Sequence, residues 1–248
     1  MWPALYLFSY AIITFYRSCN QPFRSGHSTE TALIRLTDQF LRNMDNDEVT
    51  GLVFIDFRKA FDVIDHEPLL KQLFIYGATP SSVAWFKSYL FERKQFISSG
   101  KSRSKQLTVK QSVLQGSILG PVLFLLFVND MPLHVQKSTM DIYADDTTLL
   151  LSSNWKTLPL LNQSLSQDLS EVERWARENK MYMNMQKTKA LLVTGKRLRK
   201  RMVQHTGKLG VKTDNAEIEQ VANHKLLGMI TDEDLTYEVH VDKLCSKR

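Results

Sequence analysis

Acidic residues at the ends of apolar, β-prone segments constrain this chain more than any other feature of its sequence. The segment 51–57, GLVFIDF, has the pattern of a short buried strand that ends on Asp56. The segment 140–151, MDIYADDTTLLL, contains two β-prone runs on either side of Asp145 and Asp146. We therefore expect a hairpin with this acidic pair at its tip. If the two segments are neighbours in a sheet, their ends bring three carboxylates together.

Such an acidic cluster is unfavourable unless cations neutralise it. Magnesium prefers carboxylate oxygens, water and substrate phosphates, and two such ions can activate a primer 3′-hydroxyl and stabilise a leaving pyrophosphate. Asp56, Asp145 and Asp146 are therefore candidate metal ligands and candidate catalytic residues. The same pattern also fits aspartates at a turn and at a strand end that only face water.

Helical and β-like patterns alternate along the rest of the chain. Apolar side chains predict helices over 28–44, 68–76, 81–91, 116–128 and 158–180. Short β-prone runs occupy 95–99, 106–113 and 190–194, and the first two are expected to pair as a hairpin. The sequence thus predicts a mixture of helices and short strands.

Composition places the chain among globular proteins with few cysteines. Hydrophobic residues make up 43% of the 248 residues and charged residues 23%, which excludes disorder as the overall state. The net charge of +6 fits a nucleic-acid partner, among other partners. Cys19 and Cys245 lie at opposite ends. This placement argues against a disulfide scaffold or zinc finger and suits an intracellular compartment, either nucleus or cytoplasm.

The N-terminal segment is strongly apolar and has no charge before Arg17. It is shorter than the roughly 20 apolar residues of a spanning helix, and it lacks the basic start and cleavage site of a signal peptide. We interpret residues 1–20 as a buried helix or an atypical leader, with membrane association as the alternative. No stable membrane partner is expected, and the sequence carries no signal of oligomeric state.

A strongly basic run, GKRLRKR, begins at Gly195. Its five basic residues are Lys196, Arg197, Arg199, Lys200 and Arg201. Such a run is typical of a solvated loop, and a nucleic-acid contact is the more specific interpretation.

Several strings, taken in order, resemble the motifs of reverse transcriptases, and the LINE-type class of non-LTR retrotransposons is the most similar. Motifs A, B and C are resembled by FIDFRKAFDVIDH at 54–66, QGSILGP at 115–121 and YADD at 143–146. The finger motif, motif D and the motif E region are resembled by FRSGHSTETAL at 23–33, NMQKTKALLV at 184–193 and HKLLGMITDEDLTYEVHV at 224–241. The resemblance covers about residues 21–244.

This resemblance implies an α+β polymerase palm, in which helices back a small antiparallel sheet that carries the carboxylates. It divides the chain into partial fingers at 21–50 and 66–113 and a palm at 51–65 and 114–248. There is no room for a thumb after the motif E region, so we expect a truncated domain with weak or absent activity in isolation. The implied reaction is RNA-directed DNA synthesis from a dNTP on a primed RNA or DNA template, with Mg²⁺ or Mn²⁺.

The resemblance also assigns roles to individual residues. Asp56 and Asp145 match the two-metal ligands, and Asp146 is the neighbouring carboxylate. Phe61 matches the steric gate that crowds a ribose 2′-hydroxyl, which implies a DNA product and argues against an RNA-directed RNA polymerase. Lys187 matches a proton donor to the departing pyrophosphate.

Motif B combines a match with a departure. Gln115 and Gly116 match the turn that lies against the incoming nucleotide and the template. The family usually has GVPQG here, whereas Ser112, Val113 and Leu114 precede Gln115 in this chain. The basic fingers segment that usually precedes the finger motif is also replaced by the apolar leader. These departures support an alternative, an inactive retroelement remnant that at most binds nucleic acid.

Overall fold

The computed structural model describes residues 28–114, 116–202 and 208–246. Residues 1–20 and Gln115, for which the sequence makes predictions, lie outside these ranges. The described residues form two compact units: 59–130 with 176–181, and 28–58 with 131–175 and 182–246. The predicted partition into fingers and palm stays a prediction.

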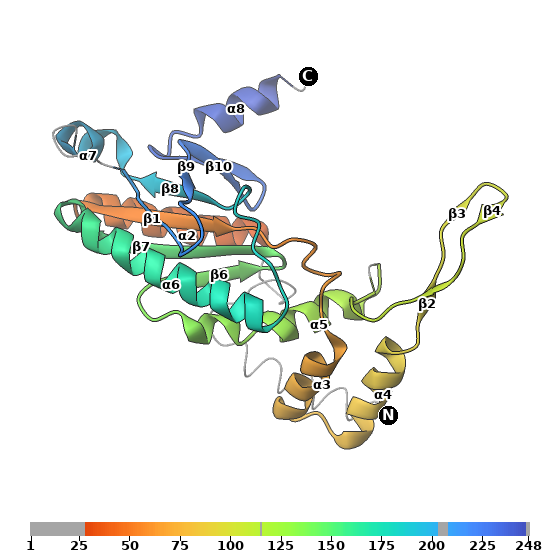
Figure 1. Cartoon of the computed structure of the whole chain (residues 1–248). Coiled ribbons are helices and arrows are strands. Elements are labelled where there is room, and N and C mark those ends of the chain that lie inside the picture. The colour runs from red at the N-terminus through yellow and green to blue at the C-terminus, as the bar shows by residue number, and fades with distance from the viewer. Residues whose placement is uncertain (1–27, 115, 203–207, 247–248) are drawn as a thin grey trace. The chain divides into compact units, whose positions relative to one another are not determined.

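A five-stranded sheet organises the second unit (Figure 1). In chain order its strands are β1 (Glu48–Ile55), β6 (Thr139–Tyr143), β7 (Asp146–Asn154), β8 (Lys189–Val193) and β9 (Glu219–Gln220). Their spatial order is β6-β7-β1-β8-β9, and only β8 and β9 run parallel. The strand before Asp56 and the hairpin at Asp145 and Asp146 are thereby confirmed, and β1 lies at the centre of the sheet.

Two helices pack against this sheet, α2 (Thr29–Asp45) and α6 (Leu158–Glu178). Successive side chains of a strand point to opposite faces. Leu52 of β1 accordingly joins a core cluster with Leu36 and Phe40 of α2. Gly51, on the other face, lies against Leu161 and Leu165 of α6. Figure 1 shows α2 behind the sheet and α6 in front of it.

Helix α6 approaches β1 closely at Gly51. A Cβ atom there would lie 2.7 Å from Leu165 Cδ1 and 2.8 Å from Leu161 Cδ2. Gly51→Val should therefore lower the free energy of unfolding by about 1–3 kcal/mol through overpacking, measured by urea denaturation. Gly210→Val is the control, because within the described part of the chain its Cβ would meet only Asn162 Nδ2, at 3.7 Å. Equal losses for the two variants would contradict this account.

The first unit consists of helices and a long hairpin. Its helices are α3 (His66–Ile75), α4 (Pro80–Leu90) and α5 (Leu119–Val128). The hairpin follows α4 and comprises β2 (Lys94–Gln95), β3 (Ser98–Ser99), β4 (Ser102–Arg103) and β5 (Leu107–Thr108). β2 pairs with β5 and β3 with β4, so the predicted hairpin across the polar loop is confirmed.

The remaining elements of the second unit surround the central sheet. They are two 3-10 helices, η1 (Met131–His134) and η2 (Trp155–Thr157), the helices α7 (Gly195–Met202) and α8 (Glu238–Cys245), and the hairpin of β10 (Asn223–Leu226) and β11 (Met229–Asp232). None of the helices in the described part of the chain combines the length and apolarity that crossing a lipid bilayer requires.

Candidate active site

Asp56 is fixed where β1 leaves the sheet, because both sides of its peptide backbone are bonded to one neighbouring segment. Asn184 N–H donates to the Asp56 carbonyl at 2.7 Å, and Asp56 N–H donates to Thr188 Oγ1 at 3.3 Å. Arg58 N–H donates to the Tyr182 carbonyl at 2.8 Å. The segment 182–188 is therefore held alongside Asp56.

The acidic pair follows from a tight turn between β6 and β7. Asp146 opens β7, and Ala144, with φ +56°, provides the left-handed residue of the turn. The antiparallel ladder of β1 and β7 ends at Ile55 opposite Thr147. Asp56 follows Ile55 on one side of this ladder, and Asp146 precedes Thr147 on the other. The register therefore places these two carboxylates opposite one another.

These residues line a pocket of about 420 Å³. Asp56 and Asp146 lie on its wall together with Lys187. The turn that carries Lys187 is closed by its own N–H, which donates to the Asn184 carbonyl at 3.0 Å. Asp145 lies at the exposed tip of the turn and is not a lining residue. The structure thus brings three of the four expected catalytic residues into one cavity.

The carboxylates of this site repel one another. Asp146 is exposed, but the protein around it removes part of the water from its carboxylate, which raises the pKa of Asp146 above its ordinary value. The nearby charges of Asp145 and Asp56 raise this pKa further. Lys225 acts in the opposite direction but does not cancel these effects. The cluster therefore holds negative charge that a cation would neutralise.

The donor set fits a magnesium ion that is shared with a substrate. No three Asp, Glu, His or Cys side chains within 28–114, 116–202 and 208–246 converge closely enough to hold a metal ion by themselves. Magnesium, however, is usually bound by one or two carboxylates, waters and substrate phosphates. Asp56 and Asp146, opposite one another at strand ends, supply such a pair.

A larger hollow of about 770 Å³ along α6 does not compete with this site. Its most buried acid is Asp168, 3% exposed. The Asp168 carboxylate accepts bonds from the backbone of Gln136, Lys137 and Ser138 and from the Ser138 hydroxyl. Asp168 is therefore a structural residue that holds the segment before β6, and nothing in this hollow repeats the paired strand-end acids.

Sequence reasoning missed several residues of the pocket. His224 stacks on Phe54, with ring centroids 4.2 Å apart, and burial, aided by the charge of Lys189, lowers the pKa of His224. Lys225 adds a positive charge beside Asp146. The string HKLLGM lies within the motif E region, but only the folded chain shows that β10 borders the catalytic pocket.

The predicted gate and motif B residues belong to the first unit. The Phe61 ring contacts Phe124, with centroids 4.4 Å apart. Gly116 has φ +81°, a conformation that glycine adopts at little cost. Gln115 lies outside the described residues. The roles of these residues stay predictions.

The basic run forms helix α7, so the prediction of a solvated loop from its composition is wrong. Leu198 and Met202 are four residues apart and buried, which gives the run an apolar face. Most of the charges on its other face are paired: Arg197 and Arg201 with Asp47, Arg199 with Glu233 and Asp234, and Lys196 with Glu238. Among the described residues, only Lys200 of the five has no acidic partner.

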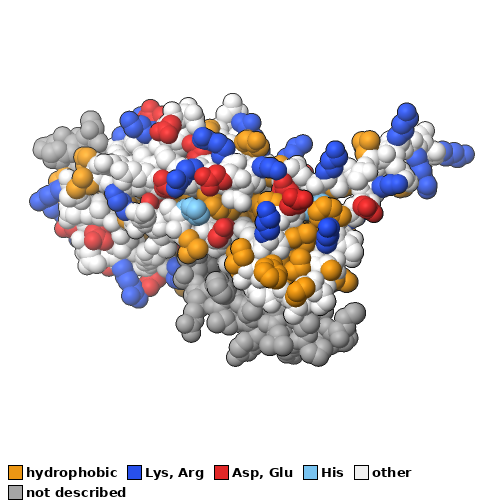
Figure 2. All heavy atoms as spheres, turned by 60° about the horizontal axis from the view of Figure 1, so that its bottom comes forward, with side chains coloured by type: hydrophobic (Ala, Val, Ile, Leu, Met, Phe, Trp, Pro, Cys, Tyr) orange, Lys and Arg blue, Asp and Glu red, His pale blue; other side chains and the backbone are white. Residues whose placement is uncertain are grey.

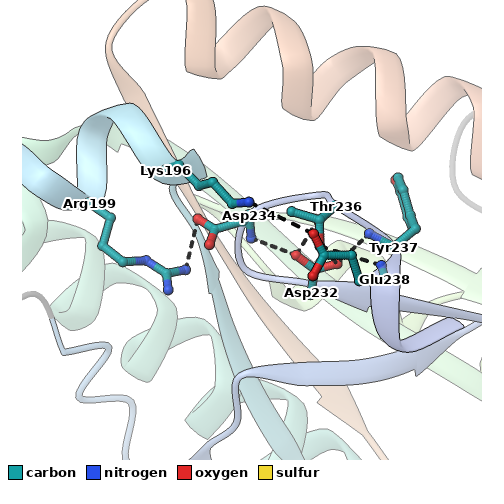
Figure 3. A network of polar contacts seen from close by, with 7 residues as sticks. All are labelled: Lys196, Arg199, Asp232, Asp234, Thr236, Tyr237 and Glu238. Carbon is teal, nitrogen blue, oxygen red and sulfur yellow. Dashed lines mark hydrogen bonds and ion pairs between the residues drawn. The ribbon is translucent and has the colours of Figure 1, made fainter. Parts of the chain in front are cut away.

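One buried carboxylate shapes the acidic turn that faces α7 (Figure 3). Asp232 accepts hydrogen bonds from Asp234 N–H at 2.9 Å, Thr236 N–H at 3.0 Å, Thr236 Oγ1 at 3.2 Å and Tyr237 N–H at 2.6 Å. The turn closed in this way presents its outer acids, Asp234 and Glu238, to Arg199 and Lys196. Asp232 thus organises most of the acids that neutralise the basic helix.

Comparison with known proteins agrees with this geometry. Residues 14–231 match the family model for "Reverse transcriptase (RNA-dependent DNA polymerase)". The chain is 32% identical over 232 residues to the "Probable RNA-directed DNA polymerase from transposon BS" of Drosophila melanogaster, covering 88% of this chain and 24% of the relative. It is 30% identical to the "RNA-directed DNA polymerase from mobile element jockey" of the same species, covering 90% of this chain and 24% of the relative.

The chain thus spans about a quarter of the length of these relatives. Among solved structures, the apo telomerase of Candida tropicalis superimposes with a TM-score of 0.58 at 12% identity, over 95% of this chain and 40% of that one. This likeness shows the fold, an α+β arrangement of the polymerase palm type. With the family match, it confirms the resemblance carried by motifs A, B and C: the chain belongs to the reverse transcriptase (RNA-dependent DNA polymerase) family.

Proposed function

We propose that this chain carries the catalytic centre of an RNA-directed DNA polymerase, which joins a dNTP to the 3′-hydroxyl of a primer. The observation that carries the proposal is the register of β1 and β7. It sets Asp56 opposite Asp146, beside Asp145 and in one pocket with Lys187. Nucleotidyl transfer needs clustered carboxylates of this kind.

Asp56, Asp145 and Asp146 would hold Mg²⁺, with Mn²⁺ as a substitute. The bound metal would act as a Lewis acid on the phosphate and would lower the pKa of the primer hydroxyl. In the reaction the primer 3′-hydroxyl releases its proton to water, and its oxygen forms a bond to the α-phosphorus while the bond to pyrophosphate breaks. The Lys187 ammonium, exposed on the pocket wall, would give its proton to the departing pyrophosphate oxygen.

The partners of this reaction are a primed RNA or DNA template and a dNTP. The proposal places the reaction inside the cell, in the nucleus or the cytoplasm. We assign Gln115 and Gly116 to the contact with the incoming nucleotide and template. The nucleic-acid role predicted for the basic run is narrowed to Lys200, because its four neighbours are engaged by acids.

Phe61 is proposed to select deoxyribonucleotides. Phe61→Ala should raise incorporation of ribonucleotides relative to deoxyribonucleotides by about 10- to 100-fold, because a pocket rejects a single added group by about that factor. Single-nucleotide incorporation of dCTP and CTP measures the ratio. Phe61→Tyr keeps the ring that packs on Phe124 and should keep the discrimination. An unchanged ratio in Phe61→Ala would remove Phe61 from this role.

Primer extension tests the proposal as a whole. The chain is incubated in excess over an oligo(dT)-primed RNA with Mg²⁺ or Mn²⁺ and all four dNTPs, so that weak binding does not hide the chemistry. Weak extension supports a polymerase. Binding of the primed RNA without extension would instead support the second candidate, a retroelement remnant that only binds nucleic acid, which the altered motif B favours.

A further inference from the structure

The hairpin after α4 is the most exposed part of the first unit. Figure 1 shows it extending away from α4. Every residue from 94 to 108 is exposed to solvent, and its two short ladders contribute no buried side chain. The hairpin therefore contributes little to the core of its unit, and its sequence is free to serve an interaction.

All the charged side chains of this hairpin are positive. Between positions 93 and 110 there is no Asp or Glu, and the basic residues are Arg93, Lys94, Lys101, Arg103, Lys105 and Lys110. None of them forms an ion pair with any residue that the structure describes. Figure 2 shows the blue side chains gathered at its end.

Helix α7 provides the contrast. Its basic run is denser than the hairpin, but four of its five charges are engaged by acids of the same unit. A cation engaged by an acid must give up this partner before it can bind a phosphate, whereas a cation without an acidic partner can bind at once and release the counterions of the nucleic acid. Of the two basic segments, the hairpin is the better suited to a polyanion.

The hairpin also carries groups that suit a nucleic acid more than another anionic surface. Phe96 is 44% exposed, and the Arg103 guanidinium lies 5.1 Å from the centre of its ring. An exposed ring beside a cation is a platform on which a nucleobase can stack. Ser98, Ser99 and Ser102 are exposed nearby and offer hydroxyl donors to phosphate oxygens.

We propose that the hairpin 93–110 binds the sugar–phosphate backbone of the primer–template nucleic acid. This inference rests on the proposed function for the identity of the partner. The contact is independent of base sequence, because cations and hydroxyls bind phosphates, which are the same at every nucleotide. It adds a second binding surface, formed by residues outside the catalytic pocket.

The test removes charge at the end of the hairpin. The variant K101Q/R103Q/K105Q is titrated against a fluorescein-labelled DNA primer on an RNA template, without dNTP, and anisotropy is followed between about 50 and 200 mM salt. The plot of log affinity against log salt should become shallower by roughly 2 to 3, since each lost phosphate contact removes nearly one released counterion. The charge-preserving variant K101R/R103K/K105R should keep the slope of the parent.

A matched control separates the hairpin from net charge. Lys71, Lys156 and Lys243 are exposed and lie on α3, η2 and α8. The variant K71Q/K156Q/K243Q loses as many positive charges as the hairpin variant. It should keep nearly the parental slope. Equal losses in the two triple variants, or a parent chain that does not bind the duplex at low salt, would overturn the inference.

Two further readouts separate this inference from binding to a membrane and from the proposed polymerase function. Vesicles containing phosphatidylserine test a membrane partner: loss of vesicle binding with unchanged duplex binding in the hairpin variant would contradict the proposal. Because binding is measured without dNTP, a hairpin-dependent salt slope supports the inference even if the parent extends no primer. Normal extension with an unaltered slope in the hairpin variant would overturn the inference and leave the polymerase proposal intact.

Discussion

Replacing Asp56, Asp145 or Asp146 by asparagine should each lower the rate of nucleotide incorporation by about 10³-fold. The substitution keeps the size of the side chain but removes the negative charge that would hold a divalent cation. That cation is worth several kcal/mol in the transition state, and each 1.36 kcal/mol corresponds to a factor of ten in rate. The measurement is single-turnover incorporation of one dNTP, with protein in excess over the primed template.

The matched control is Asp214→Asn. Asp214 is an exposed aspartate of the same unit that does not line the catalytic pocket. It should leave the rate within about twofold of the parent, since exposed substitutions away from special contacts change little. If Asp214→Asn is as slow as the others, or if the site variants keep their rate, the carboxylates do not have the proposed role.

Loss of activity should not come from unfolding. Without divalent ions the raised pKa of Asp146 means that its ionised form destabilises the folded chain. This cost is present at pH values above the raised folded pKa and disappears as the pH falls below the ordinary value of 3.8. Asp146→Asn should therefore be at least as stable as the parent at pH 7, measured by thermal unfolding. A large loss of stability would contradict this electrostatic account.

Asp232→Ala should lower the free energy of unfolding by about 2–4 kcal/mol. The carboxylate accepts three backbone N–H bonds and one hydroxyl bond, and it is 9% exposed. Hydrogen bonds to a charged group contribute more than neutral ones, and removing the acceptor leaves buried donors unsatisfied. Urea denaturation measures the loss.

The contribution of Asp232 should depend on pH. Burial alone would raise the pKa of Asp232, but the hydrogen bonds from Thr236, Tyr237 and Asp234 together outweigh it and hold the pKa below 3.8. For a carboxyl with a lowered folded pKa, the stabilisation is full above the ordinary value and is lost as the pH falls through the folded pKa. The difference between the parent and Asp232→Ala should shrink below about pH 4.

The control for this second prediction is Asp242→Ala on α8. Asp242 is exposed, and its substitution should change the free energy of unfolding by no more than about 0.5 kcal/mol. A difference between parent and Asp232→Ala that is small at pH 7, or that stays constant down to pH 3, would show that the bonds to the carboxylate do not stabilise the turn.

The elements that carry the chemistry could be predicted because their signals are local. GLVFID is a short run of β-formers that ends on an acid, and YADD interrupts two such runs, so the strand end and the turn follow from neighbouring residues. Motifs A, B and C then supplied the family. Asp56 and Asp146 lie opposite one another because β1 pairs with β7. The two β-prone runs alone do not specify this pairing.

The features that could not be predicted depend on contacts distant in sequence. His224 reaches the pocket because it stacks on Phe54, and the two residues are far apart in the chain. The composition of the basic run, which is dominated by charge, predicts a loop, whereas burial of Leu198 and Met202 and pairing with remote acids stabilise a helix. Arg, Lys and Leu are also good helix formers, so the intrinsic propensity of this run agrees with the contacts that stabilise the helix.

Template-directed incorporation tests the central claim most directly. The parent and an Asp145→Ala, Asp146→Ala double variant are each placed in excess over four primed RNA templates that differ in one template base, with Mg²⁺ and one dNTP at a time. Our account predicts that the parent adds the complementary dNTP on each template and that the double variant adds none. Addition by neither protein, equal addition by both, or addition that ignores the template base would contradict it.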